Sequence, residues 1–289
     1  MAFWLFLMSG LAVGALYALG GVGLVLLNRA TGVLNFAYGA LGALGAMCAW
    51  QAMQWGWPEP CAWALSMAIG LAISLGFGAL VAPALAKREP IVKALATLGL
   101  ALSLLGVMNL LWVVTPRRLS LAYDALSIDL GGLRITATRL LALAAGLAVT
   151  GLMGLFLART RVGLMMRAIA ENREAAAILG APIRKVEALA WGLSGLLAGF
   201  TGMLFGDLVR LDPAVLTFMV IPIVATTVVG RLTSIPVTFA AGLFIGAVES
   251  LSALAPPLAP FRLASPFVVA IFMLLWLNRG RALTFADKD

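Results

Sequence analysis

Apolar residues fill this 289-residue chain in long runs, which short charged or proline-containing breaks separate. A helix rises about 1.5 Å per residue, so roughly 20 apolar residues cross the hydrocarbon core of a bilayer, about 30 Å thick. The pattern predicts an all-α polytopic membrane protein of about 8–10 transmembrane helices in a single domain, residues 1–289. Nine candidate spans lie at about residues 5–27, 36–55, 63–86, 94–114, 139–158, 187–206, 215–230, 235–254 and 266–278, and the seventh and ninth are short.

Composition narrows the possible function classes. Hydrophobic residues make up 63% of the chain and charged residues 11%, against about 45–50% and about 25% in soluble proteins. The net charge of +8 comes from basic residues between apolar runs, where they meet anionic lipid head groups, so we expect membrane lipid and no nucleic acid as a partner. The chain has no histidine and two cysteines without metal-ligand spacing, so we expect no metal site.

Basic residues are unequally divided between the two sides of the predicted bundle. If the runs alternate in direction and the break at Asn28-Arg29 is cytoplasmic, fourteen of the twenty basic residues lie inside. The positive-inside rule then favours an N-terminus outside and a C-terminus in the cytoplasm. The first run has no basic segment before it and no convincing cleavage site, so we interpret it as a retained span and not as a signal peptide.

A polar segment at residues 159–186, on the predicted cytoplasmic side, holds six of the basic residues. Asn172 can cap a short helix whose first turn carries Glu174, and an acid there suits the helix dipole. Gly180 suits the left-handed residue that ends a helix, and Pro182 prevents its continuation. The segment therefore predicts a helix of about two turns outside the bilayer, which is either a docking element or an ordinary amphipathic surface loop.

The longest predicted external segment, residues 115–138, has a short alternating pattern around two glycines that is typical of a β-hairpin. This segment is either a cap over an external vestibule or a plain connector. Trp55, Trp57 and Trp63 lie around Pro58 on the same side, and we interpret them as an interfacial aromatic belt, with a role in binding as the alternative.

Small residues recur at three- and four-residue steps in the sixth run, at Gly195, Gly199, Gly202 and Gly206. Such spacing lets the backbone of another helix approach closely. We therefore expect helix packing at these glycines, with direct contact to a substrate as the alternative.

A polar break between the first and second runs contains Asn35. Non-helical backbone at membrane depth is tolerated only where protein surrounds it or where it lines a water-filled cavity. Asn35 is therefore a candidate pathway residue, with Phe36 and Tyr38 as candidate wall residues. The alternative is a turn at the membrane interface in which Asn35 caps the second helix.

Two later residues are further candidates for a pathway. Thr226 follows Pro222, and a proline inside a span can free carbonyl groups to line a pathway. Glu249 is the one acid well inside a predicted span, where an acid is costly and often functional. Glu249 either faces a pathway, forms a structural hydrogen bond or carries a proton.

One motif in the polar segment resembles a known cytoplasmic signature. Glu174-Ala175-Ala176, followed after three residues by Gly180, matches the core of the motif by which binding-protein-dependent ABC permeases contact their ATPase subunits. The apolar-x-Leu-Pro sequence that often follows this core is absent here.

Further stretches extend the likeness over essentially the whole chain, which resembles the LivH-type permease subunit of branched-chain amino acid ABC transporters. These stretches are NRATGVLNFA at residues 28–37 with Gly39 after it, Arg167-Ala168 before the motif, and LSGLLAGFTGMLFG at residues 193–206.

The resemblance implies the partners and the site. They are a second related permease, two ATP-binding subunits and a periplasmic solute-binding protein, at the bacterial inner membrane. Arg167, Glu174, Ala175, Ala176 and Gly180 would couple the chain to the ATPases. The chain lacks the G-x-x-x-x-G-K-[ST] pattern, so we expect it to be no enzyme and to bind no cofactor, while the partner ATPases hold ATP and Mg²⁺.

The substrates that the resemblance implies are leucine, isoleucine and valine, and a permease for urea or amides is the alternative. One rival is an ion-coupled secondary transporter that uses Glu249, but the sequence has neither paired ions inside the spans nor clear inverted repeats. A second rival is a membrane scaffold without transport activity, which the cytoplasmic polar segment argues against.

Overall fold

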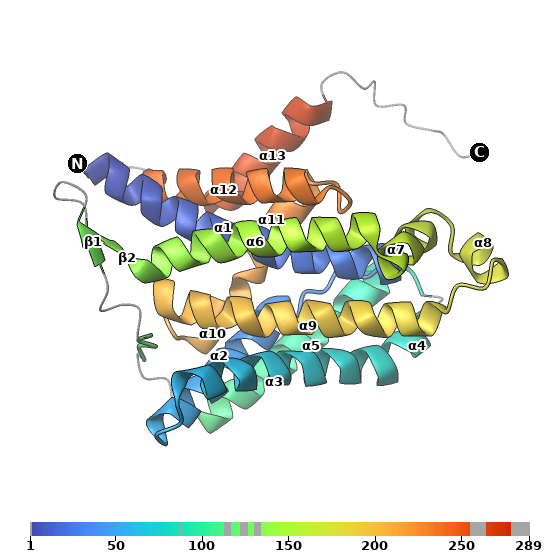
Figure 1. The fold of residues 1–289 in the computed structure, drawn as a ribbon, viewed down its shortest axis with the longest axis horizontal. Coiled ribbons are helices and arrows are strands. Elements are labelled where there is room, and N and C mark those ends of the chain that lie inside the picture. The colour runs from blue at the N-terminus through green and yellow to red at the C-terminus, as the bar shows by residue number, and fades with distance from the viewer. Residues whose placement is uncertain are drawn as a thin grey trace.

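Each of the nine apolar runs forms helix in the computed structural model, which describes residues 2–86, 88–112, 117–121, 127–129, 134–254 and 264–278. Most of the helices lie side by side along the long axis of the molecule (Figure 1). The predicted all-α polytopic membrane fold is therefore confirmed. Within the described ranges, six helices are long and apolar enough to cross a membrane: α1 (Ala2–Thr31), α3 (Glu59–Leu80), α5 (Pro90–Leu111), α6 (Ala137–Arg159), α9 (Ile183–Leu208) and α12 (Ile235–Ser252).

The remaining runs form shorter helices. They are α2 (Tyr38–Gln54), α13 (Ser265–Asn278) and a seventh run that is split at Met219 into α10 (Pro213–Phe218) and α11 (Val220–Val229). A helical proline lacks an N–H, and its ring clashes with the carbonyl four residues earlier. For Pro222 that residue is Phe218, the last residue of α10, so the proline accounts for the position of the break. A short α4 (Ala82–Leu85) follows α3.

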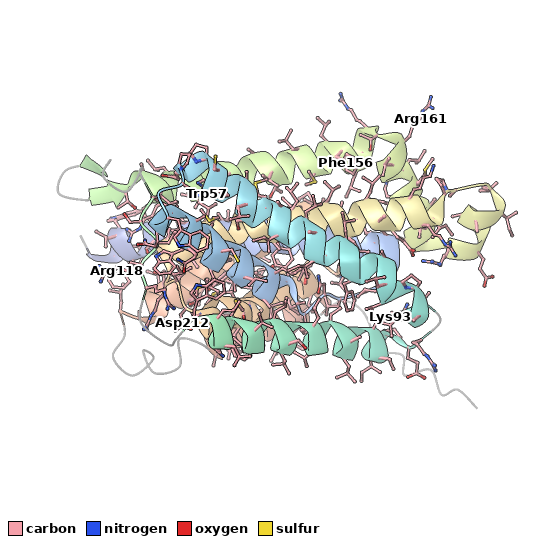
Figure 2. All side chains as sticks on the ribbon, turned by 90° about the horizontal axis from the view of Figure 1, so that it is seen from below. Trp57, Lys93, Arg118, Phe156, Arg161 and Asp212 are labelled. Atoms are coloured by element: carbon pink, nitrogen blue, oxygen red, sulfur yellow. The ribbon has the colours of Figure 1, made fainter. Side chains whose placement is uncertain are left out.

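The bundle has two ends, which we name by the elements that they carry. The α8 end holds α7 (Arg161–Glu171) and α8 (Arg173–Ile178), and α8 projects beyond the long helices (Figure 1). The sequence did not predict α7. Figure 2 shows Lys93 and Arg161 at the α8 end and Trp57 and Arg118 at the opposite end, the hairpin end.

The predicted hairpin is confirmed. β1 (Ser127–Asp129) pairs antiparallel with β2 (Arg134–Thr136), and Ile128 lies opposite Ile135. Much of the predicted external loop 115–138 lies outside the described residues.

The three predicted belt tryptophans differ from one another. Trp55 and Trp57 are exposed, as an interfacial role requires. Trp63 instead packs against Phe200 of α9, with 5.2 Å between the ring centroids, so it belongs to the packing of α3 on α9.

Inside the bundle, α9 packs against α1, α2 and α3. Its glycines make this packing close: Gly195 faces Gly70, Gly199 faces Ser66 and Gly202 faces Gly42. A Cβ atom at any of the three would collide with the backbone of the neighbouring helix.

Hydrogen bonds reinforce the contact between α3 and α9. Ser66 Oγ donates to the Gly199 carbonyl at 2.8 Å, and Ser74 Oγ donates to the Trp191 carbonyl at 2.6 Å. Gly206 differs from the other glycines of α9, because the nearest groups to its side-chain position are the side chains of Leu211 and Leu119.

Substitution of Gly202 tests whether this close approach stabilises the bundle. We expect Gly202→Val to destabilise the protein by about 1–3 kcal/mol or more, because the added atoms meet the backbone of α2 and no side chain can move aside. Thermal unfolding in detergent, followed by tryptophan fluorescence, measures the effect. Gly151→Val is the matched control, since open space surrounds that position on α6. Equal unfolding temperatures for the two variants would contradict the prediction.

Candidate functional site

A non-helical segment, residues 32–37, joins α1 to α2 and lies inside the bundle. Tyr38, the first residue of α2, contacts Gly23 of α1. The contact is made by the Tyr38 ring, and Gly23 lies eight residues, about 12 Å along the helix axis, before the end of α1. Backbone groups at this depth need hydrogen-bond partners within the protein.

Thr97 of α5 supplies partners for this segment. Its Oγ1 accepts a hydrogen bond from the Phe36 N–H at 3.0 Å, and its hydroxyl proton faces the carbonyls of Ala94 at 2.9 Å and Leu34 at 3.2 Å. Thr97 is fully buried. The segment is therefore fastened to α5 as well as to the helices that it joins.

Asn35 is fully buried within the segment. Its Oδ1 accepts from the Ala37 N–H at 3.0 Å within the turn before α2. The N-cap of α2 is Ala37 and no side chain caps this helix, so the alternative in which Asn35 caps it is wrong. The Asn35 Nδ2 has no hydrogen-bond partner among the described residues. Asn35 thus holds the break in place and still presents one unpaired donor.

The two helix breaks meet. Gly39 in the first turn of α2 contacts the carbonyl groups of Leu216 and Thr217 at the end of α10. The partial positive charge at the N-terminus of α2 therefore lies beside the partial negative charge at the C-terminus of α10, which is favourable. Only a glycine permits the contact, since a Cβ at Gly39 would overlap these carbonyls.

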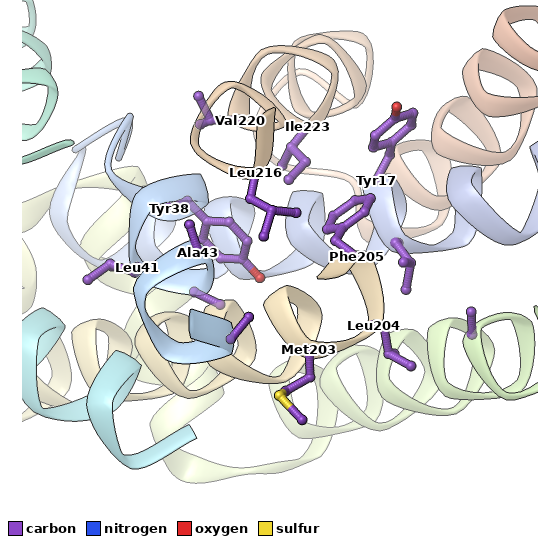
Figure 3. Close-up of a cluster of buried hydrophobic side chains, with 14 of the residues drawn as sticks. Tyr17, Tyr38, Leu41, Ala43, Met203, Leu204, Phe205, Leu216, Val220 and Ile223 are labelled. Carbon is purple, nitrogen blue, oxygen red and sulfur yellow. The ribbon is translucent and has the colours of Figure 1, made fainter. Parts of the chain in front are cut away.

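A small void of about 10 Å³ lies between α2, α9, α10 and α11. It has room for about one water molecule. Tyr38 Oη and Thr201 Oγ1, 3.2 Å apart, lie beside it. Figure 3 shows Leu216 and Phe205, which line the same void, close to Tyr38.

A larger cavity of about 360 Å³ lies on the other side of α10 and α11, against α1, α12 and α13. Its walls are mostly apolar and include Met219, Pro222 and Phe267. The acid in the wall is Glu249, which is 5% exposed and accepts a hydrogen bond from Tyr17 Oη at 2.8 Å.

The side chains of Met219, Tyr17 and Phe205 separate the small void from the larger cavity. Met219 lines both of them, and Tyr17 of the larger cavity packs against Phe205 of the void with 5.7 Å between ring centroids. Figure 3 shows the Tyr17 and Phe205 rings next to each other. The break at Met219 therefore lies at the partition.

A third cavity, of about 720 Å³, opens at the hairpin end. Arg117, Arg118, Arg210 and Asp207 line it, so both signs of charge are present. The Arg117 guanidinium lies 5.0 Å from the centroid of the Trp50 ring. The wall of this third cavity is much more polar than the wall of the cavity beside Glu249.

At the opposite end, α8 has the geometry that the sequence predicted. Asn172 Oδ1 accepts from the Ala175 N–H at 2.9 Å and caps the helix. Gly180 has φ +83°, the left-handed conformation that follows a helix end. Ala176 is buried in a cluster with Met166 of α7 and Val186 of α9, so α8 is attached to the bundle.

The tip of α8 carries two large apolar side chains in solvent. Ile178 is 87% exposed and Leu179 is 86% exposed. An ion pair between Arg173 and Glu187 ties the start of α8 to α9. Two adjacent exposed apolar side chains on a projecting helix that is held to the bundle suit a contact with another protein.

The predicted site residues do not form one group. Glu174 is exposed on α8, whereas Arg167 lies on α7 and donates from Nη2 to the Ala158 carbonyl at 3.5 Å. Thr226 bonds to the Ile223 carbonyl at 2.7 Å and packs against Gly21 of α1, outside the walls of the three cavities.

The sequence did not identify several residues of these sites. Tyr17 could have been identified, because it is a phenol in the middle of an apolar span. Ile178 and Leu179 could also have been identified, because they are two large apolar residues at the end of a short helix in a polar segment. Thr97 and Phe205 carried no such signal, since their roles depend on contacts across the bundle.

Comparison with known proteins gives one family and one relative, and no solved structure matches the chain. The probable branched-chain amino acid transport permease protein LivH of Methanocaldococcus jannaschii is 29% identical over 250 residues, which cover 80% of this chain and 75% of that protein. The sequence model of the family described as "branched-chain amino acid transport system / permease component" matches residues 6–277. A match over nearly the whole length means that the chain belongs to this family of membrane transport permeases.

Proposed function

We propose that this chain is the transmembrane permease subunit of an ABC importer for branched-chain amino acids. Membership of the permease family supports transport across a membrane. The exposed apolar pair Ile178 and Leu179, on a helix that projects beyond the spans, is the observation that carries the proposal of a partner subunit. Separate ATPase subunits hold ATP and Mg²⁺ and drive the import, and the chain itself is a transport subunit and not an enzyme.

The α8 end faces the cytoplasm and the hairpin end faces outward. The excess of basic residues at the breaks on the α8 side supports this orientation, with the N-terminus outside and the C-terminus in the cytoplasm of a bacterial inner-membrane protein. The charged cavity at the hairpin end is then available to a periplasmic solute-binding protein. A second related permease completes the pathway.

Coupling takes place at α8. Glu174, Ala175, Ala176 and Gly180 form or end this helix, and its apolar tip fits a groove of an ATPase subunit. The ATPases can switch the permease only if they bind its outward-open and inward-open states with different free energies. Arg167, on the neighbouring α7, belongs to the coupling set by resemblance alone.

The substrate passes the region where the helices are broken. Tyr38 beside the void and Glu249 beside the larger cavity are the pathway residues that the cavities support. Asn35 and Phe36 belong to the non-helical segment 32–37, and Thr226 packs against Gly21 of α1. An apolar cavity of about 360 Å³ with one carboxylate suits a small solute with an aliphatic side chain and an ammonium group.

Two charged side chains in place of the apolar pair test the docking proposal. We expect Ile178→Asp with Leu179→Asp to weaken ATPase association roughly tenfold or more per residue, because burying each side chain contributes about 1.5–3 kcal/mol. Copurification of P-loop ATPase subunits from native membranes and the ATPase rate in proteoliposomes measure the effect.

The matched control is the double exchange Ile178→Leu with Leu179→Ile, which keeps an apolar tip of equal size. This variant should retain ATPase association and substrate uptake. Full ATPase recovery with the aspartate variant would rule out the tip of α8 as the docking element.

Glu249→Gln tests the pathway proposal. This change keeps the shape of the side chain and replaces the carboxyl group by an amide, whose oxygen can still accept the Tyr17 hydrogen bond. Hydrogen bonds to charged groups contribute about 1.5–3 kcal/mol, so loss of the carboxylate's bond to the ammonium group of the substrate should lower leucine uptake roughly tenfold or more. ATP-driven uptake of labelled leucine into proteoliposomes is the measurement.

Glu89→Gln is the control, since Glu89 is an exposed acid before α5 and should tolerate the change. Unchanged uptake with Glu249→Gln would remove Glu249 from the pathway. Uptake by the parent chain alone, driven by a proton gradient without ATP, would instead favour an ion-coupled transporter that uses Glu249. Preferential uptake of urea or amides would replace the proposed substrate class.

A further inference from the structure

The cavity at the hairpin end, which we call the hairpin-end cavity, forms where two distant parts of the chain meet. Residues 117–121 lie against the turn from α9 to α10. Arg117 pairs through its backbone with Leu211 in an antiparallel bridge, and the Leu121 N–H donates to Asp207 Oδ1 at 3.4 Å. The cavity of about 720 Å³ lies between the two parts, so contacts at two points hold its walls together.

The described lining of this cavity carries three arginines and one aspartate: Arg117, Arg118, Arg210 and Asp207. Arg118 and Arg210 are exposed, and their guanidinium groups have no ion-pair or hydrogen-bond partner among the residues that the structure describes. Figure 2 shows Arg118 at this end of the molecule. Arg117 is partly buried and lies over the Trp50 ring. The positive charge of the cavity is therefore carried in part by side chains that a solute can reach.

The chemistry of the lining suits a zwitterion. A guanidinium group donates two parallel hydrogen bonds to a carboxylate. Asp207 accepts from the Leu121 N–H, and a carboxylate has about four acceptor positions, so Asp207 can accept from an ammonium group as well. An acid in the wall repels a simple anion, but it attracts the ammonium group of an α-amino acid.

The position of the cavity suits a solute on its way into the bundle. Gly206 of α9 lines the hairpin-end cavity, and the preceding residue, Phe205, lines the small void. Gly206 itself adds no side chain to the cavity. A solute bound here therefore lies next to the partition that Phe205 forms with Tyr17 and Met219.

We propose that the hairpin-end cavity binds the charged groups of a free α-amino acid before the amino acid enters the bundle. Arg118 and Arg210 bind its carboxylate, and Asp207 binds its ammonium group. The inference rests on the proposed function, which makes this end the outer one and an amino acid the substrate. A solute-binding protein can deliver its amino acid here, and the selection of an aliphatic side chain is then left to the apolar cavity beside Glu249.

Protection of the arginines from chemical modification tests the proposal. The full-length chain in phosphatidylcholine nanodiscs, without partner subunits, is treated with 4-hydroxyphenylglyoxal, which modifies accessible guanidinium groups, and mass spectrometry measures the modification of each arginine. Leucine at ten times its dissociation constant should slow the modification of Arg118 and Arg210 roughly tenfold, because the occupied site does not react.

Two analogues of leucine show which of its groups are recognised. Leucinamide lacks the carboxylate and should give little protection, although its ammonium group can still reach the cavity beside Glu249. The anion 4-methylpentanoate lacks the ammonium group and should protect less than leucine does. In Asp207→Asn, leucine and 4-methylpentanoate should protect equally, and if this variant does not fold, the labelling of the parent chain decides.

Arg139 is the internal control, because it lies in the first turn of α6 at the same end and outside the lining of the cavity. Leucine should leave the modification of Arg139 unchanged. Unprotected Arg118 and Arg210, equal protection by leucinamide, or equal protection of Arg139 would each overturn the proposal. Protection by a solute-binding protein but not by free leucine would assign the arginines to a protein contact and overturn it as well.

Uptake by the assembled transporter separates this inference from the proposed function. ATP-driven leucine uptake together with unprotected Arg118 and Arg210 would refute the binding site alone. Absence of leucine uptake by a transporter that contains all its subunits would refute the proposed function, whatever the labelling shows.

Discussion

The shape of the site depends on one constraint: backbone polar groups away from water need partners inside the protein. Thr97 meets this need for the non-helical segment 32–37, together with the Asn35 side chain. Because the segment is satisfied there, α2 can begin within the bundle, and the ring of its first residue, Tyr38, reaches Gly23 of α1. That position brings Gly39 against the end of α10, so the meeting of the two breaks follows from the same hydrogen bonds.

Close backbone contact is the second requirement, and glycine provides it where the helices cross. Gly199 and Gly202 bring α3 and α2 against α9, and the serine hydroxyls of α3 bond to carbonyls of α9 across the contact. With 26 residues, α9 is about 39 Å long and reaches from the α8 end to the void beside Thr201. The single helix α9 therefore adjoins both the α8 end and the void beside Thr201.

Local patterns in the sequence were sufficient for much of this structure. Apolar runs located the helices, alternation located the hairpin, and Asn172 with Gly180 located α8, since each signal depends on residues near one another in the chain. The contact between Tyr17 and Glu249 joins residues 232 positions apart, and no local pattern encodes it. The helix α7 was missed because apolar and basic residues alternate there at a helical period within a segment interpreted as a loop.

The projecting helix α8 is connected to the cavities through α9 and the side chains at its two ends. Arg173 of α8 is bound to Glu187 near the start of α9, and farther along α9 Phe205 packs against Tyr17, which holds Glu249. A well-packed helix moves as a unit, because its close contacts leave no room for local deformation. A shift of α8 along this path would therefore act on the void and on the larger cavity together, since Phe205 and Tyr17 form their partition.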